Sequence, residues 1–286
     1  MVGAFFLCYK HLFPNGNFKE FNTKQQKINF YLKWLSSYKM YIILKKILKS
    51  LLSKKNLFNL ELFFRRIYAI FYFGKSVECN VCNSKFRKFI NENNTKICPK
   101  CGSTSRNRHL FELINNLKLD KNSSILDFSP SRAIYRKFKS IYNQNYVASD
   151  FSGEFIADKN YDITNLDCDD NKVDLIICFH ILEHIVDDRK AMKELFRVLK
   201  PNGICLIQTP FKDGEIYEDF SIILPSEKAK HFGQSDHVRI YSINGLISRL
   251  KEVGFEVEDK NYNYEFKNRN GFNTNNTILI AKKHTK

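Results

Sequence analysis

The fold is decided by residues 162–210, which read DITNLDCDDNKVDLIICFHILEHIVDDRKAMKELFRVLKPNGICLIQTP. Residues 173–179 form a near-continuous apolar run, which is typical of a strand in the middle of a parallel sheet. Residues 187–199 show the periodicity of a helix that ends before Pro201-Asn202-Gly203, and an apolar strand is expected at residues 204–209. The stretch therefore predicts a strand–helix–strand unit.

The same rhythm extends outward from this unit in both directions. Further strands are expected at residues 124–128, 146–149, 255–258 and 277–281, and further helices at residues 108–119, 132–142 and 242–253. Alternation of this kind predicts a doubly wound α/β sheet. Such sheets bind their ligands at the carboxyl ends of the strands, where the strand order reverses.

Four cysteines before the sheet form two CxxC pairs, Cys79 with Cys82 and Cys98 with Cys101. Two such turns supply four soft sulfur ligands at tetrahedral spacing, which favours a small zinc ribbon over residues 77–104. Because cysteine would fill all four positions, the zinc would be structural rather than catalytic. A redox pair and a chance clustering of cysteines are the alternatives.

Composition sets the outer bounds. A chain of 286 residues with 43% apolar content accommodates one full-sized domain and a smaller one. Cysteines in a metal pattern indicate a reducing compartment. The net charge of +16 raises nucleic acid or an anionic membrane as a partner, although heavy use of Lys, Asn, Ile and Phe also reflects genome composition. Most of the excess positive charge lies before the ribbon.

Residues 1–76 are predicted to be a basic amphipathic helical segment, in which apolar residues from Ile43 to Leu51 fall opposite Lys45, Lys46 and Lys49. One interpretation places this face on an anionic bilayer, and the other packs it against protein. No stretch has the length and apolarity of a membrane span, and the first residues lack the pattern of a secretion signal. We therefore expect a cytoplasmic protein, with peripheral contact at the inner face of the membrane as the first interpretation implies.

The block HILEHI, followed by a helix and LKPNG, resembles the class I S-adenosylmethionine-dependent methyltransferases. More narrowly, the chain resembles bacterial methyltransferases that carry a CxxC…CxxC ribbon before the catalytic domain and a segment like YEDFSI…HFGQSDHVRIY. The resemblance covers about residues 79–282. It implies a Rossmann-like, seven-stranded α/β sheet over residues 105–286, with S-adenosylmethionine as cofactor.

The resemblance also implies roles for residues at the strand ends. Asp150 would accept hydrogen bonds from both ribose hydroxyls of the cofactor, because a carboxylate accepts two donors at once. Asp162 would face the adenine amine, and Ile163 would cover the adenine ring. Further cofactor contacts are expected from Asp127, Ser129, Ser131, Phe151, Phe179 and His180.

The loop after the first strand departs from the family pattern, because residues 127–132 read DFSPSR and contain no glycine. One interpretation is a site that keeps the fold and has lost the cofactor. The other is that Ser129, Ser131 and the following helix N-terminus bind the cofactor carboxylate. The downstream acidic residues favour an active enzyme.

Candidate catalytic residues are His237, Asp236 and His180. An Asp-His pair supplies a general base with a pKa near the working pH, while the alternative is that Asp236 and His237 only fix their loop. Glu183 and His184 have the same two interpretations, a catalytic pair or a satisfied capping pair.

The hypothesis for function is O-methylation of a sugar or other small or lipid-linked acceptor in surface-glycan synthesis, which the ribbon-bearing relatives imply. An RNA methyltransferase is the first competitor, although the ribbon is only modestly charged and no NPPY motif is present. A non-catalytic scaffold with a degenerate cofactor loop is the second.

Overall fold

The computed structural model describes residues 54–92, 94–264 and 268–284. Contacts divide the chain into a unit up to Leu57 and a compact unit from Phe58 to Lys286. The predicted amphipathic stretch from Ile43 to Leu51 lies outside the described residues.

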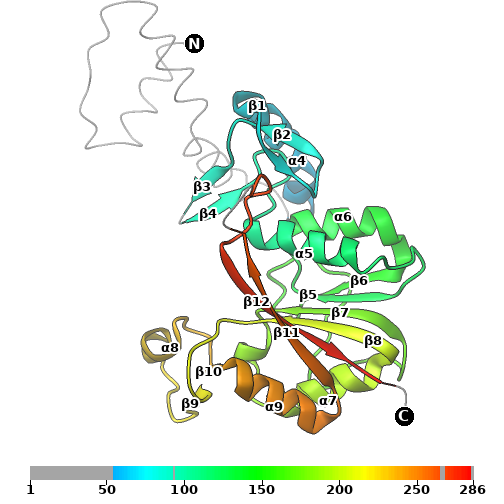
Figure 1. Cartoon of the computed structure of the whole chain (residues 1–286), viewed down its shortest axis with the longest axis vertical. Helices are drawn as coiled ribbons and strands as arrows, with labels where there is room; N and C mark the ends of the chain where they lie inside the picture. Colours follow the sequence, from blue (N-terminus) through cyan, green and yellow to red (C-terminus); the bar gives the residue numbers. More distant parts are fainter. Residues whose placement is uncertain (1–53, 93, 265–267, 285–286) are drawn as a thin grey trace, which may run out of the picture. The chain divides into compact units, whose positions relative to one another are not determined.

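The compact unit begins with the end of helix α4 (Lys54–Ala69) and the short η1 (Ile70–Tyr72), followed by two small antiparallel hairpins (Figure 1). The first hairpin pairs β1 (Phe73–Cys79) with β2 (Ser84–Phe86), and the second pairs β3 (Ile90–Glu92) with β4 (Thr95–Ile97). These hairpins carry the four ribbon cysteines or lie directly before them, so the ribbon precedes the large sheet as predicted.

The large sheet has six strands in the order β11-β12-β8-β7-β5-β6. Its strands are β5 (Ile125–Phe128), β6 (Tyr146–Ser149), β7 (Val173–Phe179), β8 (Leu199–Gln208), β11 (Glu256–Asn263) and β12 (Asn275–Lys282). Strands β6, β5, β7 and β8 run parallel, whereas β12 and β11 are antiparallel to their neighbours. The chain passes from β5 to β6 on one side and returns to β7 on the other, so the strand order reverses between β5 and β7.

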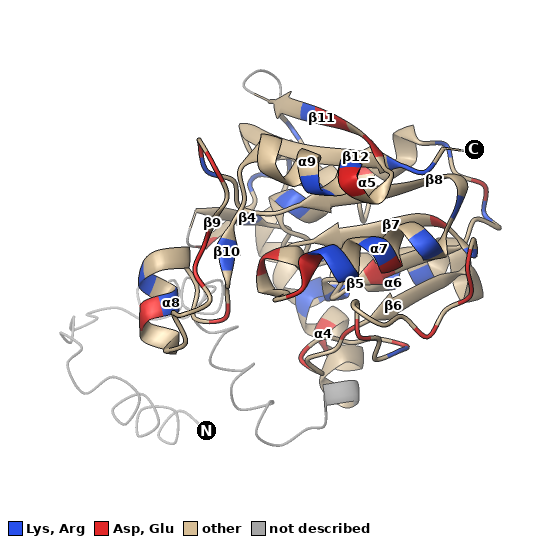
Figure 2. Ribbon diagram, turned by 90° about the horizontal axis from the view of Figure 1, so that it is seen from below, with Lys and Arg blue, Asp and Glu red and all other residues tan. Residues whose placement is uncertain are grey.

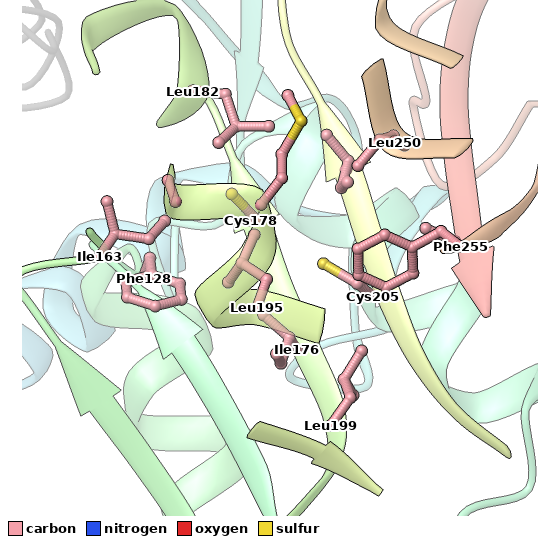
Figure 3. Packing of buried hydrophobic residues seen from close by; sticks show 14 of the residues in the cluster. Phe128, Ile163, Ile176, Cys178, Leu182, Leu195, Leu199, Cys205, Leu250 and Phe255 are labelled. Carbon is pink, nitrogen blue, oxygen red and sulfur yellow. The ribbon is translucent and has the colours of Figure 1, made fainter. Parts of the chain in front are cut away.

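Helices cover both faces of the sheet, which confirms the predicted doubly wound α/β fold (Figure 1). Helices α5 (Ser105–Asn116) and α6 (Arg132–Tyr142) lie on one face, and α7 (Asp188–Val198) and α9 (Ile243–Val253) lie on the other. On the second face, aliphatic residues of β7, α7 and α9 pack with Phe128 and Phe255 into a continuous core (Figure 3). The central strand β7 has the bounds predicted for it.

The sheet has six strands where the resemblance implies seven. Between β6 and β7 the described chain forms only isolated bridges, a parallel one between Ser149 and Lys159 and an antiparallel one between Asp162 and Asn165. The stretch that would continue this pairing, residues 152–162, is short and rich in polar and charged residues. Its backbone hydrogen bonds to the end of β6 are confined to Asp158 and Lys159, while Glu154 and Tyr161 donate to side chains. The prediction of a seventh strand was therefore wrong.

An insertion between β8 and α9 carries β9 (Tyr217–Glu218), α8 (Pro225–Phe232) and β10 (Arg239–Ile240). It projects beyond the end of the sheet in Figure 1. Strands β9 and β10 pair with each other, and Phe211 forms a bridge to Tyr241 that closes the insertion at its base. His237 lies directly before β10, so the insertion brings it back toward the sheet.

Candidate functional site

The four ribbon cysteines converge on one point. One sulfur from each lies within 4.8 Å of the others, and Cys79–Cys101 and Cys82–Cys98 are each separated by 3.7 Å. Four sulfurs at about 2.3 Å from a zinc ion would lie about 3.8 Å apart, so the spacing fits a tetrahedral zinc site. No cysteine of the four is in a disulfide. The arrangement fits structural zinc without an open position.

Arg108 on α5 joins the ribbon to the large domain. Its buried guanidinium donates to the carbonyl oxygens of Ser103 and Lys96, at 2.7 and 3.0 Å, and to that of Gly271 at 3.0 Å. It also lies over the ring of Phe89, 4.0 Å from the centroid. One side chain therefore links the second CxxC turn with the loop before β12.

Helix α4 is held on α6 by a buried ion-pair cluster. Glu61 accepts from Arg65 at 3.0 Å on its own helix and from Arg136 at 3.1 Å on α6, and Arg132 lies 3.4 Å away. Burial opposes ionisation of Glu61, but Arg65 and Arg136 outweigh it and lower the pKa of Glu61 to about 2. The end of the predicted amphipathic segment is thus part of the folded unit.

The loop after β5 adopts the backbone conformation that glycine usually provides. Ser129 has a φ of +49°, in the left-handed region, although it carries a side chain. Its hydroxyl donates to Asp150 Oδ1 at 2.8 Å, and its N–H donates to the Ser149 carbonyl at 2.7 Å. Ser131 caps α6 by accepting from the Ile134 N–H at 3.3 Å. The loop therefore keeps a sharp turn and a helix N-terminus without glycine.

Asp150 lies at the end of β6 with local donors already in place. Besides Ser129, its carboxylate accepts from the Ser152 hydroxyl at 3.1 Å and from the Phe155 N–H at 3.0 Å. Binding of ribose hydroxyls by Asp150 therefore requires that cofactor donors replace some of these local ones. Phe151, the next residue, is largely exposed.

The other predicted cofactor residues differ in how exposed they are. Asp127 is buried within the sheet, accepts from the Tyr146 hydroxyl at 2.8 Å, and has a pKa raised by burial to about 8. Asp162 is exposed and accepts from the Thr164 N–H and hydroxyl, which lower its pKa. Ile163 packs into the core near Phe128 (Figure 3). Asp127 therefore lies inside strand β5, whereas Asp150 directly follows β6 and Asp162 lies in the connection between β6 and β7.

A cluster of histidines and a carboxylate lies beyond the carboxyl end of β7. His180 has a φ of +59°, and its Nδ1 lies 3.2 Å from Glu183 Oε1. In η3 (Leu182–His184), His184 places its Nδ1 3.1 Å from Asp236 Oδ2 and its ring edge-on to that of His237, with centroids 4.6 Å apart. Left-handed backbone at both Ser129 and His180 marks this sheet edge as locally strained.

The three predicted catalytic residues are brought to one area, but in different pairs than expected. Asp236 contacts His184, whereas His237 Nδ1 lies 3.1 Å from the carbonyl oxygen of Phe232. Glu183 is buried, which opposes its ionisation, yet His180 and His184 hold its pKa below the ordinary value. Glu183 and His184, for which a capping role was an equal alternative, are therefore central to the cluster.

A buried polar network, which sequence reasoning missed, holds η3 against the insertion. Arg239 donates to the carbonyls of Leu182, Ile185 and Val186 and to Glu218, the last at 2.8 Å. Glu218 also accepts from Arg249, which in turn contacts Asp188 at 2.5 Å. Arg239, Arg249 and Glu218 are all visible in the sequence. Their spacing along the chain does not show that they pair, so sequence reasoning could not find the network.

No helix among the described residues is long and apolar enough to cross a membrane. The exposed face of α4 and the residues after it nevertheless carry an apolar stripe, made up of Leu60, Phe63, Ile67, Ile70 and Phe73. Leu60, Phe63 and Ile67 follow one another at spacings of three and four residues, so their side chains share one face of α4.

Comparison with known proteins matches a family model described as a methyltransferase domain to residues 104–260. A probable S-adenosylmethionine-dependent methyltransferase of Mycolicibacterium smegmatis is 31% identical over 97 residues, which are 34% of this chain and 34% of that protein. An uncharacterized protein of Methanocaldococcus jannaschii is 34% identical over 84 residues, 28% of this chain and 37% of that protein. The chain thus aligns with about a third of the length of these curated relatives.

Solved structures with a similar fold include a phosphoethanolamine N-methyltransferase of Haemonchus contortus, in complex with phosphomonomethylethanolamine and S-adenosylhomocysteine. It is 14% identical, with a TM-score of 0.43 and coverage of 62% of this chain and 53% of that chain. A 1,6-didemethyltoxoflavin-N1-methyltransferase of Burkholderia thailandensis is 14% identical, with a TM-score of 0.44 and coverage of 63% and 79%.

Proposed function

The chain belongs to the methyltransferase-domain family, and from this premise we propose that it transfers a methyl group from S-adenosylmethionine to an acceptor hydroxyl. The acceptor we propose is a sugar, either free or lipid-linked, in the synthesis of a surface glycan. S-adenosylmethionine, when bound, supplies an electrophilic methyl group. The protein's own residues must then bind the cofactor, align the acceptor and take up the hydroxyl proton.

The observation that carries this proposal is the cluster of His180, Glu183, His184 and His237 next to the strand-order reversal. Ligands of doubly wound sheets bind at that edge, so an acceptor there would meet several imidazoles. A neutral amine attacks with its free lone pair, whereas a hydroxyl must give up its proton as it attacks, so a general base is more useful for O-methylation. His180, whose ring is half-buried, would act as the base.

Cofactor binding would fall to the loop after β5 and the end of β6. The turn at Ser129 and the N-terminus of α6 provide N–H groups and a favourable dipole for the cofactor carboxylate. Asp150 would provide the acceptor for the ribose once its local donors are replaced, and the exposed Asp162 would contact the adenine amine, whereas Ile163, predicted to cover the adenine ring, is buried in the core. These residues fit the cofactor, which supports an active enzyme over a scaffold.

Charge placement favours a small or lipid-linked acceptor over RNA. Figure 2 shows Lys and Arg alternating with Asp and Glu along α7 and α8. Helix α6 carries four basic residues and no acid, but Arg132 and Arg136 pair with Glu61, and Lys139 pairs with Asp158. RNA binding depends on basic residues that neutralise several phosphates along one surface. The described part of the chain offers no such concentration in these two helices.

Peripheral contact with an anionic membrane is a further part of the proposal. The apolar stripe of α4 provides a surface for the lipid interface, and the lysines and arginines before the ribbon provide the attraction. Vesicle sedimentation should show salt-sensitive binding to anionic liposomes and none to neutral ones. Replacing Phe63 and Ile67 with Ser should weaken it, whereas unchanged binding would contradict a role for the stripe.

Two measurements test the enzymatic proposal. Calorimetry with S-adenosylhomocysteine should show one site per chain, and absence of binding would leave the scaffold hypothesis. Incubation with methyl-labelled S-adenosylmethionine and, separately, lipid-linked glycan extracts or total RNA should label the glycan fraction. Labelling of RNA alone would overturn the proposed acceptor and leave the enzymatic activity standing.

A further inference from the structure

The cluster beyond β7 contains three side chains of the kind that bind metals, and two of them are buried with a polar atom that lacks a hydrogen-bond partner. A ligand atom of each of Glu183, His184 and His237 lies within 4.8 Å of the other two. Glu183 is 1% exposed and His237 is 2% exposed. Glu183 Oε2 and His237 Nε2 have no hydrogen-bond partner among the described residues, and Glu183 Oε1 lies 3.2 Å from His180 Nδ1. Burying such groups unsatisfied costs about 1–3 kcal/mol each, more for a charged group.

We propose that Glu183, His184 and His237 bind a divalent metal ion, separate from the ribbon zinc, which holds the acceptor hydroxyl. A cation between the three groups would satisfy the orphaned carboxylate and imidazole at once, since metal coordination replaces the missing hydrogen bonds. The nearby His180 is not required as a ligand, because its Nδ1 already lies at ion-pair distance from Glu183 Oε1.

The orientation of both histidines supports this assignment. Metal-binding histidines usually donate one ring N–H to a carboxylate or backbone carbonyl and present the other nitrogen to the metal. His184 Nδ1 lies 3.1 Å from Asp236 Oδ2, and His237 Nδ1 lies 3.1 Å from the Phe232 carbonyl oxygen. With their protons on Nδ1, both rings carry the lone pair on Nε2. Asp236 and Phe232 therefore fix the tautomer that a metal needs.

The ligands are also held on a rigid support. The Val238 N–H donates to the Glu183 carbonyl at 2.9 Å, which ties the residue after His237 directly to η3. Next along the chain, the fully buried Arg239 donates to the Leu182 and Val186 carbonyls at 3.2 and 2.9 Å. Two segments that are distant in sequence are thereby fixed on either side of the cluster, as a preformed site requires.

Two imidazoles and one carboxylate leave coordination positions open, unlike the four thiolates of the ribbon. This extension rests on the proposed O-methylation. A hydroxyl bound at an open position has a lowered pKa. Its oxygen then forms the bond to the methyl carbon while the carbon–sulfur bond of the sulfonium breaks to give a neutral thioether. The hydroxyl proton passes to the imidazole of His180.

The test uses the zinc-loaded full chain and Mn²⁺ as the probe. Mn²⁺ is the weakest competitor among first-row divalent metals and prefers oxygen and nitrogen, so it leaves zinc on the thiolates. Electron paramagnetic resonance should detect one bound Mn²⁺ per chain with zinc content unchanged. Water-proton relaxation should be enhanced by bound Mn²⁺, because solvent exchanges at the open positions.

Matched variants separate ligands from neighbours. Glu183→Gln and His237→Gln should each weaken Mn²⁺ binding at least tenfold, while Asp236→Asn should weaken it about tenfold or less through the orientation of His184. His231→Asn, in the same insertion, should bind Mn²⁺ like the unmodified chain, because His231 contacts Tyr217 and lies outside the cluster. Thermal unfolding establishes that each variant is folded.

Absence of bound Mn²⁺ in the unmodified chain, or equal binding by folded Glu183→Gln, overturns the metal site and leaves a hydrogen-bonded cluster. S-adenosylhomocysteine binding is measured on the same samples. If the chain binds the cofactor but not Mn²⁺, the metal site is rejected and the proposed function stands. Mn²⁺ binding without cofactor retains the metal site and removes the proposed function together with the role of the metal in it.

Discussion

The ribbon cysteines and the Glu183–His184–His237 cluster both gather three or more ligand-bearing side chains within 4.8 Å, but they are assembled differently. The ribbon takes its ligands from two CxxC turns, each of which places two sulfurs by itself. The second cluster joins η3 to the far end of an insertion, and a buried network must hold the two together. We therefore expect the ribbon to need zinc in order to fold, whereas the Glu183–His184–His237 cluster is held in place by hydrogen bonds without a metal.

The ribbon should respond most strongly to loss of a ligand. Cys98→Ser should abolish zinc binding and unfold residues 73–104, because structural zinc contributes on the order of 10 kcal/mol to the folding of small metal domains. Hydrogen exchange should show loss of protection in β1 to β4. Arg108 links the ribbon to Gly271, so protection should also fall in the loop before β12.

Cys168→Ser is the matched control, since Cys168 is a free cysteine outside the cluster. It should leave zinc content and exchange unchanged. A ribbon that keeps its protection in Cys98→Ser would show that packing, rather than metal, maintains the hairpins, and the contrast between the two sites would disappear.

The second cluster should depend on its network. Arg239→Met should destabilise the domain by about 3–5 kcal/mol, because it leaves the carbonyls of Leu182, Ile185 and Val186 without their donor and removes one of the two arginines that pair with Glu218. Arg189→Met is the control, since its ion pair with Glu252 is exposed and worth at most about 1 kcal/mol. Denaturant unfolding measures both. Equal effects would mean that the insertion is not held by Arg239.

Asp127 and Glu183 are both buried acids, yet their pKa values move in opposite directions. Burial raises the pKa of Asp127 from 3.8 to about 8, so between these values the folded protein keeps a proton that the unfolded chain has released. Stability should therefore fall as pH rises from about 4 to about 8, by up to about 1.4 kcal/mol per pH unit.

Asp127→Asn should remove this slope and stabilise the protein at pH 7.5 by about 2–4 kcal/mol, while changing little at pH 4. Urea unfolding across this pH range provides the measurement. A slope that survives the substitution would assign the pH dependence to other groups. Although burial opposes its ionisation, the hydrogen bond with His180 holds the pKa of Glu183 below the ordinary value, so Glu183 is the acid suited to a cation.

The sequence was most informative where structure depends on neighbours in the chain. The bounds of β6, β7 and α6 were predicted correctly, because alternation and apolar runs are local signals. Helix α5 begins three residues before the predicted start at Arg108, where Thr104 and Asn107 form a capping box. The capping-box pattern was present in the sequence, but it has Asn107 at the third helical position, where Glu or Gln is more common.

Contacts between distant segments could not be predicted in the same way. Asp236 and His237 are adjacent in sequence, yet Asp236 contacts His184 and His237 contacts Phe232. Asp236 lies in the turn that follows α8 and His237 just after it, and the chain changes direction there, so adjacency does not make a pair. The missing seventh strand has a similar origin, because strand formation after Ser149 depends on partners that sequence does not specify.

Measurements of cofactor binding test whether Asp150 and Asp162, at the carboxyl ends of the strands, bind the cofactor as predicted. Asp150→Ala should weaken S-adenosylhomocysteine binding by about 1.5–3 kcal/mol, the scale of hydrogen bonds to a charged group. Asp162→Ala should cost less, because contact with Ile163 would remain. Asp213→Ala, on an exposed loop, is the control. Calorimetry showing equal affinity for Asp150→Ala and the control would place the ribose elsewhere.

The smallest expected effect concerns the loop without glycine, where the sequence departs from its family. Ser129 bears the strain of a left-handed backbone, about 1–2 kcal/mol for a residue with a Cβ atom, and offsets part of it by donating to Asp150. Ser129→Ala keeps the strain and loses the hydrogen bond, so it should destabilise the fold by about 1 kcal/mol. Ser129→Gly loses the same bond but relieves the strain, so its stability should lie near that of the unmodified chain. The difference between the two variants, measured by denaturant unfolding, isolates the backbone term, because both lack the hydroxyl. If glycine is no more stable than alanine, the turn at Ser129 is not strained in solution. The loop would then differ from the family in backbone as well as in sequence, and cofactor binding would have to rest on Asp150 and the start of α6.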